Sequence, residues 1–395
     1  MSRMSRMLFL LAAAFVTAGL IGSTFDVSAQ DKDKKKDEKK AEKKEDKKKD
    51  EKKEIVKEEK KEPFKPDQAQ IEFKYLDKDK KEKFPWVFAV AFAADGKTVA
   101  AAYRDNTVKI WDIAAKTDIQ TFQGMPTETK GLAFVKGEVF VSTGKWNKEK
   151  KAWEGEIKTW DAKNGKGGKS LKGHAATIES LAISKDGKFL ASASDDKTVI
   201  LWDLAAGKET QTIKGHTDGV LSANFSPDGK QLVTTSADKT VRVWDIAGAK
   251  ELVEFKVERI VEIKDVKGKD AKGKDVKQTE LGREFTHAVF TSDGKKIVAG
   301  NLDGVIKIYD VESKKEDKEL KAHEGVWALA LSPDGTKLAT GGYDQTIKIW
   351  DVATGKDLRT IKAHLGTVTT LSFSPDNQWL ASGGIDGLVK IWSVK

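Results

Sequence analysis

The histidines are the side chains of this sequence best suited to proton transfer or metal binding, and there are five. Four of them stand 21 or 22 residues before an aspartate, and a serine or threonine stands four residues before each of those aspartates. A tryptophan follows each aspartate after six residues. The four sets are His174, Ser192, Asp196 and Trp202; His216, Thr234, Asp238 and Trp244; His323, Thr340, Asp344 and Trp350; His364, Ser382, Asp386 and Trp392. A group that is repeated four times favours a structural role over a single catalytic centre.

Other catalytic signatures are missing from the sequence. It has no Gly-rich phosphate loop, no nucleophile elbow and no histidines at metal-binding spacing. It has no cysteine, which excludes disulfides and thiolate metal sites. We therefore expect no catalytic residues, no metal and no cofactor. His287 aligns with strand positions and not with the repeated group.

A short apolar–aromatic ending recurs seven times and sets the period of the chain. The aromatic positions are Trp111, Trp160, Trp202, Trp244, Tyr309, Trp350 and Trp392, and aspartate follows all but the last. Their separations are 49, 42, 42, 65, 41 and 42 residues. A period near 42 is typical of four-stranded propeller blades.

Each repeat also has the local pattern of β-hairpins. Residues 221–225 and 232–235 predict two strands, and the Ser-Pro-Asp-Gly-Lys sequence at 226–230 predicts the turn between them. Related Asp-Gly or Asp-Asn turns recur in five other repeats, and no helical stretch interrupts the pattern. The sequence therefore predicts an all-β array.

Over residues 69–395 the chain resembles the WD-repeat (G-beta-like) family. The resemblance implies a seven-bladed β-propeller whose blades have four strands each. It also implies that the four sets above form hydrogen-bonded tetrads in the third, fourth, sixth and seventh blades. Three repeats depart from the pattern, with Ala101 in the first, Lys150 and Glu154 in the second, and Ala299 in the fifth. We expect those blades to be less tightly braced.

The last repeat has room for only three strands, because it ends three residues after Trp392. Residues 70–76 resemble the outer strand at 250–256, and we expect them to supply the missing strand, as ring closure in the family implies. The propeller would then span residues 67–395 and be monomeric.

The N-terminal region has the pattern of an export signal. Arg3 and Arg6 precede an apolar stretch at 8–21, and Val27-Ser28-Ala29 fits a cleavage site, so residues 1–29 read as a signal peptide. An uncleaved signal anchor in the membrane is the alternative. We expect an exported, bacterial-type member of the family, located in the periplasm, at the cell surface or outside the cell.

Residues 30–66 predict a charged spacer, either an expanded coil or a fraying helix. Between 31 and 62 there are 16 Lys and 13 acidic residues, with the two signs interleaved. Contact with cell wall or lipid headgroups is an alternative role for this segment. The net charge of +9 does not by itself argue for nucleic acid, which we do not expect as a partner.

The leading functional hypothesis is a non-catalytic scaffold that binds protein partners through the propeller face bearing the tetrad histidines. Two insertions, an enlarged hairpin at 145–154 and residues 258–282, emerge on that face. The candidate contact residues are Trp146, Trp153, Phe88, Arg104, Lys130, Glu179, Trp327 and Tyr343. The alternative is a small-molecule or carbohydrate sensor, or a degenerate enzyme, that uses the central channel.

Overall fold

The computed structural model describes residues 68–395, except for residues 77, 78, 80, 124 and 257–283. Within that last gap it describes the backbone of 258–261 and 278–281. The predicted signal peptide and the whole of the predicted spacer lie outside the described residues and stay predictions. Residues 65–395 belong to one compact unit. No described residue lies in a helix that is long and apolar enough to cross a membrane.

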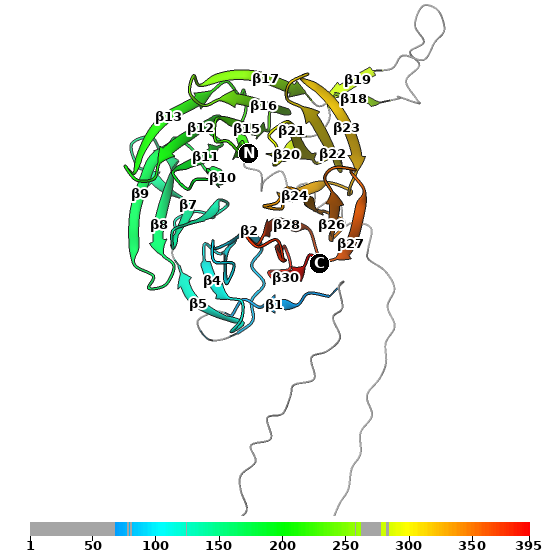
Figure 1. Ribbon diagram of the computed structural model, residues 1–395. Coiled ribbons are helices and arrows are strands. Elements are labelled where there is room, and N and C mark those ends of the chain that lie inside the picture. Colours follow the sequence, from blue (N-terminus) through cyan, green and yellow to red (C-terminus); the bar gives the residue numbers. More distant parts are fainter. Residues whose placement is uncertain are drawn as a thin grey trace, which may run out of the picture. The chain divides into compact units, whose positions relative to one another are not determined.

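The described residues form seven antiparallel four-stranded sheets, which are the seven blades of a β-propeller (Figure 1). The first blade consists of β2 (Val87–Phe92), β3 (Thr98–Tyr103), β4 (Val108–Asp112) and β5 (Thr117–Phe122). The second consists of β6 (Leu132–Val135), β7 (Glu138–Asn147), β8 (Ala152–Asp161) and β9 (Gly167–His174). The third consists of β10 (Ile178–Ile183), β11 (Phe189–Ser194), β12 (Thr198–Asp203) and β13 (Lys208–Lys214).

The other four blades follow the same order. The fourth consists of β14 (Val220–Phe225), β15 (Gln231–Ser236), β16 (Thr240–Asp245) and β17 (Lys250–Lys256). The fifth consists of β20 (Phe285–Phe290), β21 (Lys296–Asn301), β22 (Val305–Asp310) and β23 (Lys315–Lys321). The sixth consists of β24 (Val326–Leu331), β25 (Lys337–Gly342), β26 (Thr346–Asp351) and β27 (Asp357–Lys362). The seventh consists of β28 (Val368–Phe373), β29 (Trp379–Gly384), β30 (Val389–Ser393) and β1 (Ile71–Phe73).

The hydrophobic core lies between the blades. The innermost strand of each blade contacts those of the two adjacent blades, and β28 contacts β2, so the ring is closed. Seven apolar clusters of buried side chains each join two consecutive blades. The three inner strands of each blade therefore bury apolar side chains against neighbouring sheets, whereas the outer strands are more exposed, as in β23.

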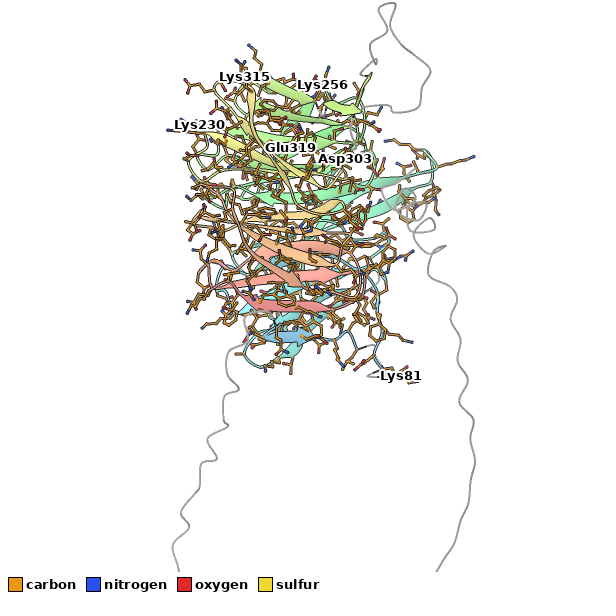
Figure 2. All side chains as sticks on the ribbon, turned by 90° about the vertical axis from the view of Figure 1, so that its right-hand side faces the viewer. Lys81, Lys230, Lys256, Asp303, Lys315 and Glu319 are labelled. Carbon is orange, nitrogen blue, oxygen red and sulfur yellow. The ribbon has the colours of Figure 1, made fainter. Side chains whose placement is uncertain are left out.

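The strand directions define two faces. The turn after the first strand of a blade lies on the bottom face, where Lys230 marks one such turn at the left of Figure 2. The connection to the next blade and the turn after the second strand lie on the top face, where Lys81 marks a connection at the right. The Asp-Gly turns fall on the bottom face as hairpin turns. Gly229 has a φ of +71°, and the Asp228 carboxylate accepts a bond from the Lys230 N–H.

The predicted closing strand is present. Ile71 pairs with Ile391 and Phe73 with Val389, which makes β1 the outer strand of the seventh blade. Phe73 is buried and its ring stacks on Trp111 of the first blade at 4.9 Å, while the Tyr75 hydroxyl contacts the Thr107 hydroxyl. The N-terminal segment therefore joins the seventh blade to the first.

The three blades that lack a tetrad histidine have an aromatic contact in its place. In each of these blades, the aromatic residue near the end of the third strand packs on a phenylalanine from the outer strand of the preceding blade. The pairs are Phe73–Trp111, Phe122–Trp160 and Phe255–Tyr309, with ring centroids 4.9, 5.3 and 4.2 Å apart. At the same register in the four tetrad blades the preceding strand has Leu171, Ile213, Leu320 or Ile361. The expectation that these three blades are less tightly braced overlooked this stacking.

The second repeat was aligned incorrectly from sequence. The enlarged hairpin at 145–154 is present as an extension of β7 and β8, in which Trp146 pairs with Trp153 and Lys145 with Glu154. Because β7 and β8 extend as paired strands, Glu154 is a strand residue. The register places Val141, and not Lys150, where the tetrad blades have serine or threonine. The other insertion contains a hairpin, in which β18 (Glu258–Val261) pairs with β19 (Gln278–Leu281).

Candidate partner-binding face

The structure brings the members of each of the four sets together. In the fourth blade, His216 Nδ1 lies 2.8 Å from Asp238 and Nε2 lies 2.7 Å from the Thr234 hydroxyl, which accepts a bond from Trp244 Nε1. An imidazole with its proton on Nδ1 satisfies both contacts. The same three contacts, at 2.7 to 2.9 Å, occur around His174, His323 and His364.

The tetrad aspartates are held ionised by these networks. Burial alone would raise the pKa of Asp196, but hydrogen bonds from His174, Thr198 and the Ala175 N–H lower it to about 2. The same balance of burial against a histidine hydrogen bond lowers the pKa of Asp238, Asp344 and Asp386. These residues link the top-face connection of each blade to its second and third strands, so their role is structural.

A β-bulge near the top of the inner strand sets the channel rim in six blades. The pairing register skips one residue in each of these strands. The skipped residues are Phe88, Glu179, Leu221, Thr286, Trp327 and Thr369. Three of them, Phe88, Glu179 and Trp327, are predicted contact residues, and a fourth predicted contact residue, Lys130, precedes β6. A bulge re-aims its side chain away from the pleat.

The candidate contact residues differ in how accessible they are. Trp327 is buried and packs on Tyr343, with the ring centroids 5.6 Å apart. Phe88 is half-buried, and the Arg104 guanidinium lies over the Trp86 ring at 4.4 Å. Trp327 therefore offers a partner little surface.

The β7–β8 extension carries the exposed tryptophans. All 11 tryptophans are described, and only Trp146 and Trp153 are classed as exposed, at 45% and 41%. Their rings meet edge to face with centroids 5.5 Å apart. The extended ribbon projects beyond the rest of the top face, at the right of Figure 2. Thus the two indoles pack on each other and still leave almost half of their surface to solvent.

Two of the predicted contact residues, Lys130 and Glu179, belong to a group of charged side chains on the same face, whose other members are Asp195 and Glu128. Glu179 forms an ion pair with Lys130, and Asp195 and Glu128 lie within electrostatic range of that pair. Burial, followed by the charge of Glu179, raises the pKa of Asp195 to about 6, and burial also raises the pKa of Glu128. The four residues come from three separate connections or strands, so no local sequence motif could have revealed the group.

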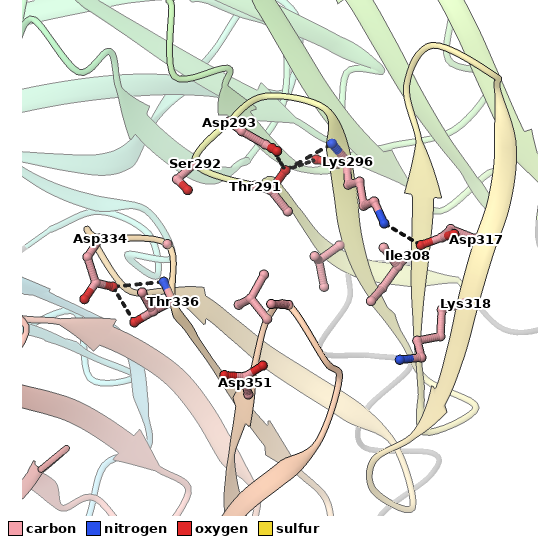
Figure 3. A pocket seen from close by; sticks show the side chains of 14 residues that line it. Thr291, Ser292, Asp293, Lys296, Ile308, Asp317, Lys318, Asp334, Thr336 and Asp351 are labelled. Carbon is pink, nitrogen blue, oxygen red and sulfur yellow. Dashed lines mark hydrogen bonds and ion pairs between the residues drawn. The ribbon is translucent and has the colours of Figure 1, made fainter.

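The bottom face has a cleft of about 570 Å³ between the fifth and sixth blades (Figure 3). Its charged side chains are already engaged, since Lys296 pairs with Asp317 at 2.7 Å and Asp334 accepts bonds from Thr336. Among the described residues, no three or more His, Asp or Glu side chains cluster in a way that could hold a metal ion.

Fold and site together define a seven-bladed propeller with internal tetrads and an uneven, partly apolar top face. The family model for the WD domain, G-beta repeat, matches residues 81–112, 165–203, 207–245, 282–310, 314–351 and 355–393. The chain belongs to this WD-repeat family, whose propellers generally act as protein-interaction scaffolds. Residues 113–164, which the family model does not match, contain most of the second blade, including the atypical extension of β7 and β8.

Similar proteins were found among eukaryotes. The nuclear distribution protein nudF of Aspergillus niger is 27% identical over 135 residues, which cover 29% of this chain and 29% of the relative. Human transducin beta-like protein 2 is 29% identical over 130 residues, which cover 31% of this chain and 27% of the relative. The chain thus matches less than a third of the length of each of these relatives.

Proposed function

We propose that this protein is an exported scaffold that binds a protein partner through the top face of its propeller. The observation that supports this most strongly is the exposed Trp146–Trp153 pair at the tip of the extended ribbon. The two rings pack on each other, yet 45% of Trp146 and 41% of Trp153 stay exposed, and aromatic anchors of this kind dominate protein interfaces. Leu365, at 86% exposed, adds apolar surface on a top-face connection.

The test is capture of the partner from the native host by the full-length mature protein, compared with the Trp146→Ala/Trp153→Ala double variant. We expect the melting temperature to stay within a few degrees and the capture to weaken more than about tenfold, because a hot spot contributes roughly 2 kcal/mol. Phe189→Ala is the matched control, since Phe189 is an exposed aromatic at the bottom-face end of β11. Loss of capture by the control but not by the double variant contradicts top-face binding.

Export rests on the signal pattern of residues 1–29 and has its own test. N-terminal sequencing of protein from the native host should begin near Gln30. An intact Met1 on membrane-extracted protein would replace the exported form with the signal-anchored one. The capture experiment is independent of this outcome.

A further inference from the structure

Exposed lysines mark the outer rim of the top face. In six of the seven blades a lysine stands at or near the top-face end of the outer strand, directly after an apolar residue. These outer-rim lysines are Lys74, Lys172, Lys214, Lys256, Lys321 and Lys362, and all six are exposed. The ammonium groups of Lys74, Lys172 and Lys256 lie 3.0 to 3.9 Å from a carboxylate. No described residue forms an ion pair with the other three, so their charge is left for a binding partner.

The aspartates of the adjacent top-face turns are turned inward. In the sixth and seventh blades, the side chains of Asp344 and Asp386 are only 23% and 7% exposed, and each is bound by its tetrad histidine. Glu324, three residues after Lys321, is by contrast exposed. A partner that approaches Lys321 and Lys362 therefore meets two free ammonium groups and one exposed carboxylate.

Leu365 is held in solvent by its own backbone. Its N–H donates to the Asp386 carboxylate at 2.9 Å, and 86% of the residue is exposed. The corresponding residues after the other three tetrad histidines are Ala175, Thr217 and Glu324, which are small or polar. Leu365 thus presents apolar surface that a partner can bury favourably.

Phe84 flanks the same turn from the other side. Asp386 is followed by Gly387, and a Cβ on Gly387 would lie 2.6 Å from the Phe84 Cα. Pro85 restricts the backbone of Phe84, which nevertheless is 61% exposed. Of the large apolar residues that the structure describes, Leu365 and Phe84 are the most exposed. They form two fixed apolar anchors on the top of the seventh blade.

We infer that the protein partner presents an acidic segment with apolar side chains to the top of the seventh blade. Its apolar side chains cover Leu365 and Phe84, and its carboxylates face the outer-rim lysines Lys362 and Lys321. Lys362 is three residues before Leu365, so charged and apolar contacts are adjacent, and Lys321 is at the same position one blade away. This inference rests on the proposed function and specifies the chemistry of the partner.

A lipid bilayer fits this surface less well than a protein does. The β7–β8 ribbon projects beyond the rest of the top face (Figure 2). A flat surface would meet the ribbon first, whereas a protein with relief of its own can reach Leu365 and Phe84 beside it.

The test measures binding of a fluorescein-labelled peptide, Glu-Glu-Leu-Glu-Glu-Phe-Glu-Glu, to the full chain by fluorescence anisotropy. The same peptide with glutamine in place of every glutamate is the uncharged control. We expect saturable binding of the acidic peptide, at least about fivefold tighter than that of the control. Equal affinities, or no saturable binding, overturn the inference.

Lysines at the two ends of the same outer strands give matched variants. Lys321→Glu/Lys362→Glu reverses the charge at the top-face ends of β23 and β27 and should weaken the acidic peptide at least about fivefold. Lys315→Glu/Lys356→Glu reverses exposed lysines at the bottom-face ends and should change the affinity by less than about twofold. Leu365→Ser should weaken the peptide about threefold or more through lost apolar contact. Equal effects of the two double variants overturn the inference.

Removal of the exposed acid should have the opposite effect. Glu324→Gln should tighten binding of the acidic peptide, because it removes a negative charge three residues after Lys321. The affinity should also fall as the salt concentration rises, since the outer-rim lysines are exposed. An affinity that responds to neither change contradicts the electrostatic contact.

Failure of this site and failure of the proposed function give different results. If Lys321→Glu/Lys362→Glu retains the native partner in full while Trp146→Ala/Trp153→Ala loses it, the scaffold role stands and the acidic-partner inference is overturned. If the lysine variant loses the partner and the tryptophan variant retains it, the acidic-partner inference stands and the tryptophan contact is wrong. If the chain binds phosphatidylglycerol vesicles through Lys321 and Lys362 but does not bind the acidic peptide, the rim faces a lipid surface, and the inference is overturned.

Discussion

Substitution of Phe73 tests whether β1 is an integral part of the ring. Phe73 is 1% exposed, pairs with Val389 in the seventh blade and stacks on Trp111 in the first. Removing a buried phenylalanine ring costs about 3–5 kcal/mol, to which the lost stacking contributes roughly 0.5–1.5 kcal/mol. Phe73→Ala should therefore lower the free energy of unfolding by about 4 kcal/mol.

Phe73→Leu separates the two parts of this loss. Leucine retains most of the apolar volume and removes the ring stack, so we expect a cost of about 1–2 kcal/mol. The four tetrad blades have leucine or isoleucine at this register, which indicates that the backbone accepts the shape. The difference in the free energy of unfolding between the alanine and leucine variants measures the contribution of apolar burial at this position.

The assay is urea unfolding followed by far-UV circular dichroism and by tryptophan fluorescence, with size-exclusion chromatography before unfolding. Glu72→Ala is the control, because Glu72 points outward on the same strand and its nearest cation, Lys390 Nζ, is 3.5 Å away. We expect the control to change stability by no more than about 0.5 kcal/mol. Equal midpoints for Phe73→Ala and Glu72→Ala would refute the view that β1 unfolds together with the blades.

Three further predictions concern the tetrads and one turn. His216→Ala leaves the Thr234 hydroxyl and the Asp238 carboxylate without their imidazole and should cost about 1–3 kcal/mol in urea unfolding; an unchanged midpoint would contradict the network. The lowered pKa of Asp196 contributes stability above its ordinary pKa of 3.8, and this contribution is lost as pH falls toward 2. The free energy of unfolding should therefore fall by about 2 kcal/mol less in Asp196→Asn than in the unmodified protein as the pH drops from 3.8 toward 2. An equal fall in the two proteins would contradict this prediction. Gly304→Ala should lower the melting temperature far more than Gly137→Ala. Both glycines have positive φ values, but only a Cβ at Gly304 would clash with a neighbour, the His323 carbonyl. Equal melting temperatures would disprove this.

The sequence was sufficient for the fold because the repeat specifies local and long-range structure together. The Asp-Gly dipeptides set the bottom turns, and the spacing of His216, Thr234, Asp238 and Trp244 matches the pairing register of the blade. The closing strand was also predictable, since its alternation of apolar and polar residues matched an existing outer strand. These features depend on contacts within one blade.

Contacts between blades were harder to predict. The stacking of Phe255 on Tyr309 joins two blades, and it was visible in sequence only as a phenylalanine at a register where four other outer strands have leucine or isoleucine. The second repeat was misaligned because a longer pair of strands and a longer loop lengthen the spacing between two repeats in the same way. The acidic group that includes Glu128 and Asp195 arises where separate segments meet in three dimensions, which a one-dimensional pattern does not encode.

Ring closure also constrains when this protein can fold during synthesis. Ile71, among the first described residues, must pair with Ile391, among the last, so the seventh blade stays incomplete until the ribosome has released almost the whole chain. Until then Phe73 has no Val389 to pair with, and the growing chain has open sheet edges at both of its ends. Pairing of such distant segments is also slow. The nascent protein therefore passes through a stage in which six blades can be formed while the ring remains open.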